Sequence, residues 1–295
     1  MSFDNSTLLR VTAQDIVNGI RNEGPSFVDL VCTNKTRKAI KGTEPYRSST
    51  DTMGKDLGGR AIGETPPLIN QSLSSIDWDM LRYHAAMALD QSELTDLSQY
   101  FEPLGEFARD LVQYVDVSME LDLQALLTDS NFNGQHAAAN GAWSANTSTP
   151  ILDIQECKRL DVPNPDMAIL GATSAAELAR HPDITGKVFN YSGGGAIAFS
   201  ALKGIVAEIL GIAPANVYIW STFYNTAKFG VAGALGRVAG DFFWCGRKEG
   251  LLKIEQENSG QVTTSETHLK TELAYSRTVD FLRVDTFLGG EITGL

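Results

Sequence analysis

The sequence lacks the cysteine and histidine patterns that define disulfide frameworks and metal sites. Its 295 residues include three cysteines, Cys32, Cys157 and Cys245, which are odd in number, widely spaced and without a C-x-x-C pair. Such a set favours thiols in a reducing compartment, so we expect synthesis inside a cell. The four histidines show no ligand spacing such as H-E-x-x-H. The sequence therefore predicts no metal site.

Long apolar runs, a secretory leader and an excess of positive charge are also missing. No uninterrupted apolar stretch reaches the about 18 residues of a transmembrane helix, and the N-terminal segment does not combine a basic start with an apolar run. We therefore expect neither membrane insertion nor secretion. The formal net charge of −12 argues against a general nucleic-acid binder, whose affinity depends on Lys and Arg.

Complete catalytic motifs are absent as well. The run YSGGGA, 191–196, is not followed by the Lys-Ser or Lys-Thr of a P-loop, and Asn190 stands where a nucleophile elbow needs glycine. The glycines of GVAGALGRVAG, 230–240, do not follow G-x-G-x-x-G. We interpret both runs as turns or close backbone contacts, and predict no catalytic residue and no cofactor. A soluble α/β enzyme using the loops around Gly193 and Gly233 stays as an alternative.

One long amphipathic helix is the clearest element that is present. Its apolar residues recur every three or four positions: Leu104, Phe107, Leu111, Val115, Met119, Leu123 and Leu126. Acidic residues fall on the opposite side: Glu102, Glu106, Asp110, Asp116 and Glu120. Pro103 suits the first helical position. The pattern predicts a helix over 103–128, roughly 26 residues and 39 Å long.

The remaining pattern mixes helices and strands. Shorter helices are predicted over 12–22, 152–160, 174–180 and 197–210. Strands are predicted over 26–32, 166–170 and 216–224, and again in several segments from Asp241 to the end. Met80–Leu89 fits either a strand or a short helix. This mixture, with a strand-rich C-terminal part, indicates an α+β fold.

The segment 33–75 differs from its surroundings in composition and charge. It is rich in Gly, Ser, Thr and Pro and has no helical period. Such a length is unusual for a loop, and we interpret it as a thin hairpin that projects from the body and lies on another molecule. Seven basic and three acidic residues lie between Lys35 and Arg60, whereas twelve acidic residues and two arginines lie between Ile76 and Ser130.

The separation of a basic segment, 35–60, from an acidic segment, 76–130, suggests a contact between copies of the chain. A nucleic-acid site has little support, because Tyr46 is the one aromatic residue among the basic residues, and a solvated charged loop is the simplest alternative. We prefer a contact in which the basic loop lies on the acidic helix of a neighbour. The basic side is predicted to be Lys35, Arg37, Lys38, Arg47 and Arg60, and the acidic side Asp110, Asp116 and Glu120.

Taken in this order, the features resemble the major capsid protein of tailed double-stranded-DNA bacteriophages. The local resemblance lies in LQALLTD, a Gly/Ala/Asn run, WS and STPILDI, and in VPNPDMAILGATSAAELARHPDI, 162–184. It implies an N-terminal arm over 1–32, an extended loop over 33–75 and a peripheral domain over 76–150 whose spine helix covers about 103–128. An axial domain over 151–240 and returning strands with a C-terminal tail to the axial domain over 241–295 complete the implied layout.

The resemblance also assigns a place to the polar run NGAWSANTSTP, 140–150. This run becomes the joint between the spine helix and the axial domain, with Pro150 just before the next helix and Asp153 in its first turn. We predict that Trp143 is a packing anchor of this joint rather than a ring that stacks on a ligand.

The function implied is that of a structural subunit without enzymatic activity. Pentamers and hexamers would form an icosahedral shell around double-stranded DNA in the virion, assembled in the host cytoplasm. The resemblance further implies non-specific DNA contact, portal and decoration proteins as partners, and a separate scaffolding protein or none. No membrane contact is expected. An encapsulin-type nanocompartment shell is the alternative with the same fold.

Overall fold

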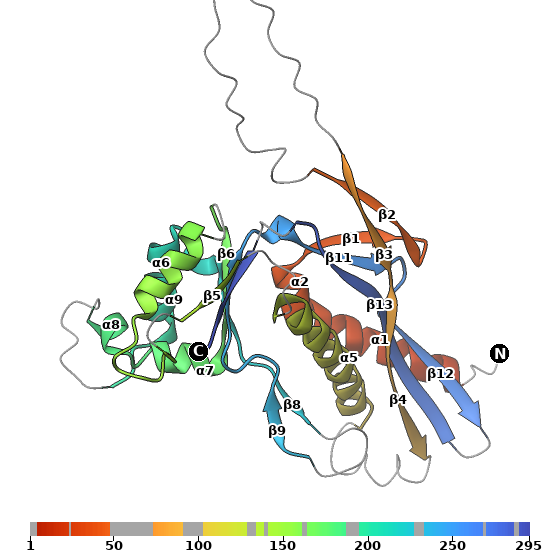
Figure 1. Cartoon of the computed structure of the whole chain (residues 1–295). Coiled ribbons are helices and arrows are strands. Elements are labelled where there is room, and N and C mark those ends of the chain that lie inside the picture. The colour runs from red at the N-terminus through yellow and green to blue at the C-terminus, as the bar shows by residue number, and fades with distance from the viewer. Residues whose placement is uncertain are drawn as a thin grey trace, which may run out of the picture.

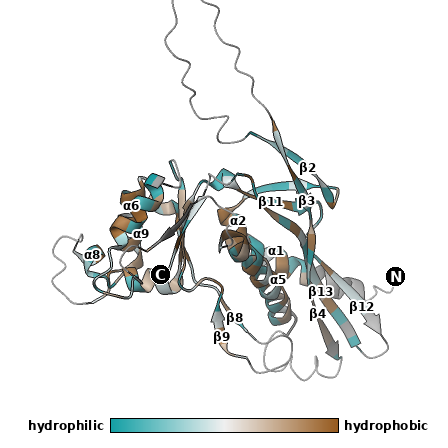
Figure 2. Ribbon diagram, viewed as in Figure 1, coloured by the Kyte–Doolittle hydropathy of each residue, from teal (hydrophilic) through white to brown (hydrophobic). Residues whose placement is uncertain are grey.

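The computed structural model is organised as two lobes and a projecting hairpin (Figure 1). It describes residues 5–23, 25–47, 73–90, 103–128, 134–138, 141–160, 164–186, 195–226, 233–267, 270–285 and 289–295. One lobe surrounds the long helix α5 (Pro103–Thr128), and we call it the α5 lobe; the other surrounds α9 (Phe199–Leu210), and we call it the α9 lobe. Each helix packs in a hydrophobic cluster, and the cluster around α5 extends to one face of the α9-lobe sheet through Met167, Ile169, Trp220 and Trp244. Figure 2 shows apolar residues along both helices.

The α5 lobe packs three helices on a mixed five-stranded sheet. The helices are α1 (Asn5–Glu23), α2 (Phe27–Val31) and α5, and the strands are β1 (Thr33–Arg37), β4 (Leu81–Asp90), β11 (Leu251–Gln256), β12 (Gln261–Thr267) and β13 (Lys270–Arg283). Leu111, Val115, Met119 and Leu123 of α5 are buried against this sheet. The stripe that predicted the helix is therefore the stripe that forms the core.

A bulge shapes the sheet of the α5 lobe. Strands β11 and β12 both pair with the same side of β13, but the pairing register shifts between them, from Glu255–Val279 to Gln261–Ser276. Asn258 and Gly260, in the bulge, have φ angles of 66° and 79°, a region that Gly and Asn tolerate best. Strand β11 pairs with β13 along one edge and with β1, in parallel, along the other.

The α9 lobe is a mixed five-stranded sheet with helices beside it. The sheet order is β5 (Gly134–Ala137), β14 (Gly289–Thr293), β10 (Phe243–Gly246), β6 (Met167–Gly171) and β7 (Val217–Trp220). The accompanying helices are α6 (Pro150–Leu160), α7 (Ala172–Leu178), α8 (Pro182–Thr185) and α9. Short 3₁₀ turns cover Pro214–Asn216 and Lys248–Gly250.

Two small two-stranded ribbons complete the structure. One pairs β2 (Lys41–Tyr46) with β3 (Ser74–Asp79), and the other pairs β8 (Phe223–Asn225) with β9 (Leu235–Arg237). The first rises above the α5 lobe (Figure 1). Residues 48–72, which include the tip of the predicted loop, lie outside the described residues. Within the described part, Thr33–Arg37 joins the sheet of the α5 lobe, so the hairpin starts at Lys41.

The α+β prediction is confirmed, and the long helix has the predicted bounds. The predicted strand over 26–32 is wrong, because Phe27–Val31 is the short helix α2. Val28 and Val31 sit three positions apart on one helical face and are both buried. Met80–Leu89 is resolved as strand, since β4 pairs along its whole length with β13. None of the described helices is long and apolar enough to span a membrane.

Candidate subunit-contact surfaces

The base of the projecting hairpin is fixed by ion pairs inside the chain. Glu44 of β2 accepts hydrogen bonds from Lys35 Nζ at 2.6 Å and from Arg37 Nη2 at 2.7 Å, both on β1. Glu44 is 7% exposed, and the hydrogen bonds from Lys35 and Arg37 lower the pKa of its carboxyl group. Lys35 and Arg37, which the sequence assigned to a neighbour, are thus used to hold the hairpin to its own sheet.

Close packing fixes the same base. The indole ring of Trp78 on β3 lies against Gly42 on β2, where an added Cβ would come within 2.5 Å of the ring. Trp78 and Met80 pack on Leu252 and Ile254 of β11 in a small separate core. The hairpin therefore leaves the α5 lobe at a direction set by packing and by Glu44.

The other three residues of the predicted basic set are Lys38, Arg47 and Arg60, and the two that the structure describes are exposed to solvent. Lys38 is 89% exposed and lies 3.7 Å from Glu257, a distance at which an exposed ion pair contributes little. Arg47 is exposed at the end of β2. Arg60 lies outside the described residues. Lys38 and Arg47 are therefore the described members of the basic set that face solvent.

The predicted acidic face of α5 needs a correction. Asp110 is half-buried, but Asp116 and Glu120 point into the protein. Asp116 accepts a hydrogen bond from Arg21 of α1 at 2.6 Å, and Glu120 accepts one from Trp220 Nε1 of β7 at 2.8 Å. The helical spacing of 100° per residue predicted that Asp116 and Glu120 face solvent. That prediction is wrong because α1 and the α9 lobe cover this side of α5.

Burial raises the pKa of both carboxyl groups, Asp116 and Glu120. It raises the pKa of Asp116 above its usual value although Arg21 lies beside it, and it raises the pKa of Glu120 although Trp220 donates a hydrogen bond to it. Each carboxylate is thus tied to a partner of its own chain. The contact between copies stays a prediction, and Asp110 is the residue of the acidic set that remains partly open to a neighbour.

A buried ionic cluster lies between α2 and the sheet of the α5 lobe. Asp29 of α2 binds Lys253 of β11 and Arg277 of β13, and Glu255 binds the same two cations. The Arg277–Glu255 distance is 2.7 Å, the Lys253–Glu255 distance is 2.9 Å and the Arg277–Asp29 distance is 3.2 Å. Lys253 is only 2% exposed and Arg277 5%, so both cations depend on these partners.

The cluster shifts the pKa values of Asp29, Glu255 and Arg277. Burial alone would raise the pKa of Asp29, but Arg277 and Lys253 outweigh it and hold that pKa well below the carboxyl range. The pKa of Glu255 is lowered for the same reason, against the effect of burial. The pKa of Arg277 rises above its ordinary value, because Glu255 and Asp29 outweigh the effect of burial. All of these groups are therefore charged at neutral pH.

The cluster was not predicted from the sequence. Lys253 stands in LLKIEQ, which reads as an apolar strand with one charge, and Arg277 stands in an ordinary alternating strand. A charged residue at an inward position of a strand is the signal that was available. Its partner Asp29 could not be paired with it, because 224 residues separate Asp29 from Lys253.

Trp143 lies in the α9 lobe, in the segment between β5 and α6. It is 1% exposed, donates a hydrogen bond from Nε1 to Asp153 Oδ2 at 2.8 Å, and meets the ring of Phe243 edge-on at 5.6 Å between centroids. Pro150 is the first residue of α6 and is buried. The ring is thus enclosed between α6 and β10 of the α9 lobe, and its role as anchor of the joint stays a prediction.

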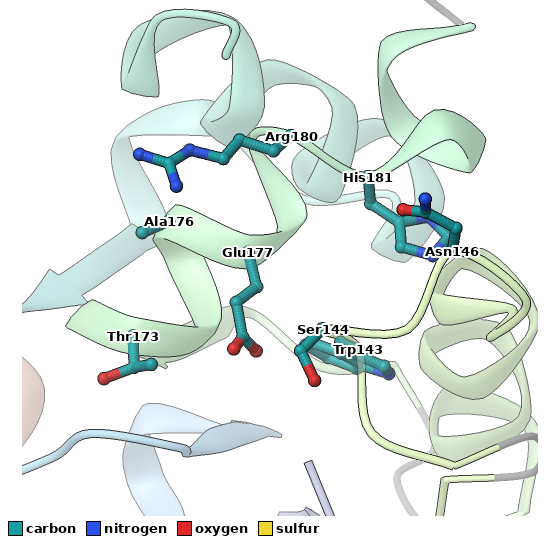
Figure 3. A pocket seen from close by; sticks show the side chains of 8 residues that line it. All are labelled: Trp143, Ser144, Asn146, Thr173, Ala176, Glu177, Arg180 and His181. Carbon is teal, nitrogen blue, oxygen red and sulfur yellow. The ribbon is translucent and has the colours of Figure 1, made fainter. Parts of the chain in front are cut away.

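A pocket of about 460 Å³ opens beside this joint (Figure 3). Its wall includes Trp143, Ser144, Glu177, Arg180 and His181. In Figure 3 the Glu177 carboxylate points toward Ser144, whereas the Arg180 guanidinium points the other way. Burial, and then Asp241, raise the pKa of Glu177.

The histidine of this pocket has a structural role. His181 Nδ1 accepts a hydrogen bond from the backbone N–H of Asp183 and caps α8, while Nε2 lies 3.1 Å from the Ala145 carbonyl oxygen. Ser148 Oγ also lies 3.1 Å from Nε2, but Ser148 is buried. Among the described residues, the hydrogen bonds of the imidazole go to backbone groups and to Ser148, and none goes to a carboxylate as in a catalytic triad. Among the described residues, no three His, Cys, Asp or Glu side chains form a metal-binding group.

The ionic cluster gives a first testable prediction. Replacing Arg277 by Met should lower the free energy of unfolding by about 3–5 kcal/mol, because Asp29 and Glu255 would share Lys253 alone. The matched change Arg109→Met, at an exposed pair with Glu106, should alter it by less than about 1 kcal/mol. Urea denaturation at pH 7 measures both, and equal effects of the two changes would contradict the role of the cluster.

The same variant has a defined pH dependence. Asp29 and Glu255 have folded-state pKa values below their ordinary values of 3.8 and 4.5. Their stabilising contribution is complete above these ordinary values and is lost as the pH falls below them. The native protein should therefore lose stability below about pH 4.5 more steeply than Arg277→Met does.

The joint gives a second prediction. Trp143→Phe keeps a ring but removes the donor to Asp153, and should lower the free energy of unfolding by about 1–3 kcal/mol. Trp143→Ala also empties the site and should lower it by about 3–5 kcal/mol. Tyr114→Ala, at an exposed aromatic residue, serves as the control, with an expected change of about 0.5 kcal/mol or less. Thermal and urea unfolding measure the three changes, and a Trp143→Ala variant as stable as the control would contradict the anchor.

No protein-family model and no curated protein matches the sequence. Solved structures match it along most of its length. A phage-related protein from Bordetella bronchiseptica RB50 has a TM-score of 0.70 at 13% identity, with 96% of this chain and 97% of that chain covered. The capsid of a native GTA particle gives 0.59 at 12% identity, with 90% and 88% covered. The capsid of cyanophage P-SCSP1u gives 0.57 at 7% identity, with 90% and 87% covered.

These identities are low, so the similarity is one of fold. It extends over both lobes, since about nine-tenths of each chain is covered. The fold inferred from the sequence resemblance is thereby confirmed. The chain has the α+β fold of phage capsid proteins.

Proposed function

We propose that the chain is the major capsid protein of a tailed bacteriophage. In this proposal its copies assemble as pentamers and hexamers into an icosahedral shell that encloses double-stranded DNA, with no catalytic activity. The observation that carries the proposal is the match to capsid structures over about 90% of the chain. Such coverage includes both lobes and their connection, rather than one common module.

The projecting hairpin, with its rigid base, supports a function that depends on contacts between subunits. A projecting two-stranded ribbon is marginally stable alone, yet here Glu44 and Trp78 fix its base rigidly. A shell closes only when each heterologous contact is made at a defined angle. A hairpin held rigidly at its base can present its outer part to a neighbour at such an angle.

The contact itself is proposed between opposite charges. Lys38, Arg47 and Arg60 would lie near the acidic surface around Asp110 of a neighbouring subunit. Lys35 and Arg37 would act indirectly, by orienting the hairpin through Glu44. Because exposed charges interact over a Debye length of about 8 Å at physiological salt, this contact should guide assembly more than it tightens the shell.

The proposed setting is the virion shell, assembled in the host cytoplasm. A separate scaffolding protein, a portal and decoration proteins are the proposed partners, together with non-specific contact with the packaged DNA. The net charge of −12 would limit adhesion of the inner wall to that DNA.

Electron microscopy of the purified full chain tests the function. We expect closed particles, and nuclease-protected double-stranded DNA inside particles taken from infected cells. A monomer or small oligomer under all assembly conditions, with or without the other structural proteins of the phage, would contradict the proposal. Particles that enclose an enzyme instead of DNA would indicate a nanocompartment shell.

The charge contact is tested separately. The triple change of Lys38, Arg47 and Arg60 to Ser should reduce particle yield severalfold and weaken its dependence on salt, while thermal unfolding of the subunit stays unchanged. Lys41→Ser is the matched control, because Lys41 lies on the same hairpin but pairs with Asp79 of its own chain. A normal particle yield from the triple variant would rule out the pairing without affecting the proposed function.

A further inference from the structure

Two thiols meet inside the α9 lobe, where α6 packs on the sheet. Cys157 Sγ of α6 lies 3.5 Å from Cys245 Sγ of β10. Both side chains are 0% exposed, and 88 residues separate them in the sequence. A disulfide has an S–S distance of about 2.05 Å, so the sulfur atoms need to approach by about 1.5 Å to bond.

The pair lies across the interface that also holds Trp143. Asp153, one turn before Cys157 on α6, accepts the hydrogen bond of Trp143, and Phe243, two residues before Cys245 on β10, contacts its ring. Both cysteines belong to the core of the α9 lobe. A bond between them would join α6 to β10 covalently at the joint.

The third cysteine provides an internal comparison. Cys32 belongs to the core of the α5 lobe, whereas Cys157 and Cys245 belong to the core of the α9 lobe. All three cysteines are described, and Cys157 with Cys245 is the pair whose sulfur atoms are in contact.

We propose that Cys157 and Cys245 are a modification site that forms a reversible disulfide when the protein meets a peroxide. One thiolate attacks a peroxide oxygen; the O–O bond breaks, a sulfenic acid forms, and hydroxide leaves and takes up the released proton. The second sulfur then attacks the sulfenic sulfur, the S–O bond breaks, the S–S bond forms and water leaves. In sum, two thiols lose two electrons and two protons, and hydrogen peroxide is reduced to two waters.

The consequence of this chemistry rests on the proposed function. A shell subunit would fold in a reducing cytoplasm with both thiols intact, so that α6 and β10 can adjust during assembly. Release into oxidising surroundings would then fix α6 to β10. Crosslinking residues so far apart in the sequence stabilises mainly by restricting the unfolded chain.

Maleimide counting tests the disulfide directly. The purified full chain is treated with hydrogen peroxide, both at a temperature just below unfolding and during refolding, then denatured, alkylated with a maleimide and weighed by mass spectrometry. Reduced protein should take up three maleimides, one for each cysteine. Oxidised protein should take up one, on Cys32, and its Tm should rise by roughly 5–10 °C. Dithiothreitol should reverse both effects.

Three variants make the result specific. Cys32→Ala should still form the disulfide, whereas Cys157→Ala and Cys245→Ala should form none and show no rise in Tm. If one of the last two does not fold, the wild-type chain and Cys32→Ala still decide the question. Three maleimides on wild-type protein after both treatments, a disulfide that includes Cys32, or irreversible sulfinic acids instead of a disulfide would overturn the proposal. The measurement needs no particles, so its failure is separate from failure of the proposed function.

Discussion

The buried ionic cluster of the α5 lobe, together with the adjoining pair Arg21–Asp116, couples the positions of the elements around it. Three cations and three carboxylates from five elements meet there: Arg21, Lys253, Arg277, Asp29, Asp116 and Glu255. A buried charge is tolerated only beside its partner. The place of α1, the helical form of α2 and the register of β11 on β13 are therefore coupled, since a shift of one element would leave a charge without its partner.

The projecting hairpin takes its direction from that cluster through a short chain of contacts. Strand β11 carries two members of the cluster and also pairs with β1, and β1 carries the two cations that bind Glu44. The packing of Trp78 on Leu252 and Ile254 of β11 adds an apolar contact at the same place. A subunit built in this way uses part of its charge to make itself rigid, and keeps its exposed charges, such as Lys38 and Arg47, for other molecules.

The described part of the α9 lobe is held together mainly by apolar packing and not by buried ion pairs. Its core is apolar, and inside it the buried ring of Trp143 lies between an aspartate of α6 and a phenylalanine of β10. The lobe packs on the α5 lobe through the other face of its sheet, where Trp220 donates a hydrogen bond to Glu120. Close backbone packing adds to this, since a Cβ at Gly171 would lie 2.1 Å from the Gly240 carbonyl oxygen. The thiol pair lies in the same apolar core, so a covalent bond there would reinforce the contact between α6 and the sheet of the α9 lobe.

Local patterns in the sequence were enough to predict the α+β class, the bounds of α5 and the order of most later helices and strands, because apolar periodicity is a local property of the chain. They also indicated that Trp143 is a buried packing residue. Three features could be known from the folded chain alone: the helical form of 27–31, the inward orientation of Asp116 and Glu120, and the binding of Glu44 by Lys35 and Arg37. These outcomes depend on partners up to hundreds of residues away, such as Asp29 and Lys253, and a pairwise electrostatic contact across that separation leaves no periodic trace in the sequence.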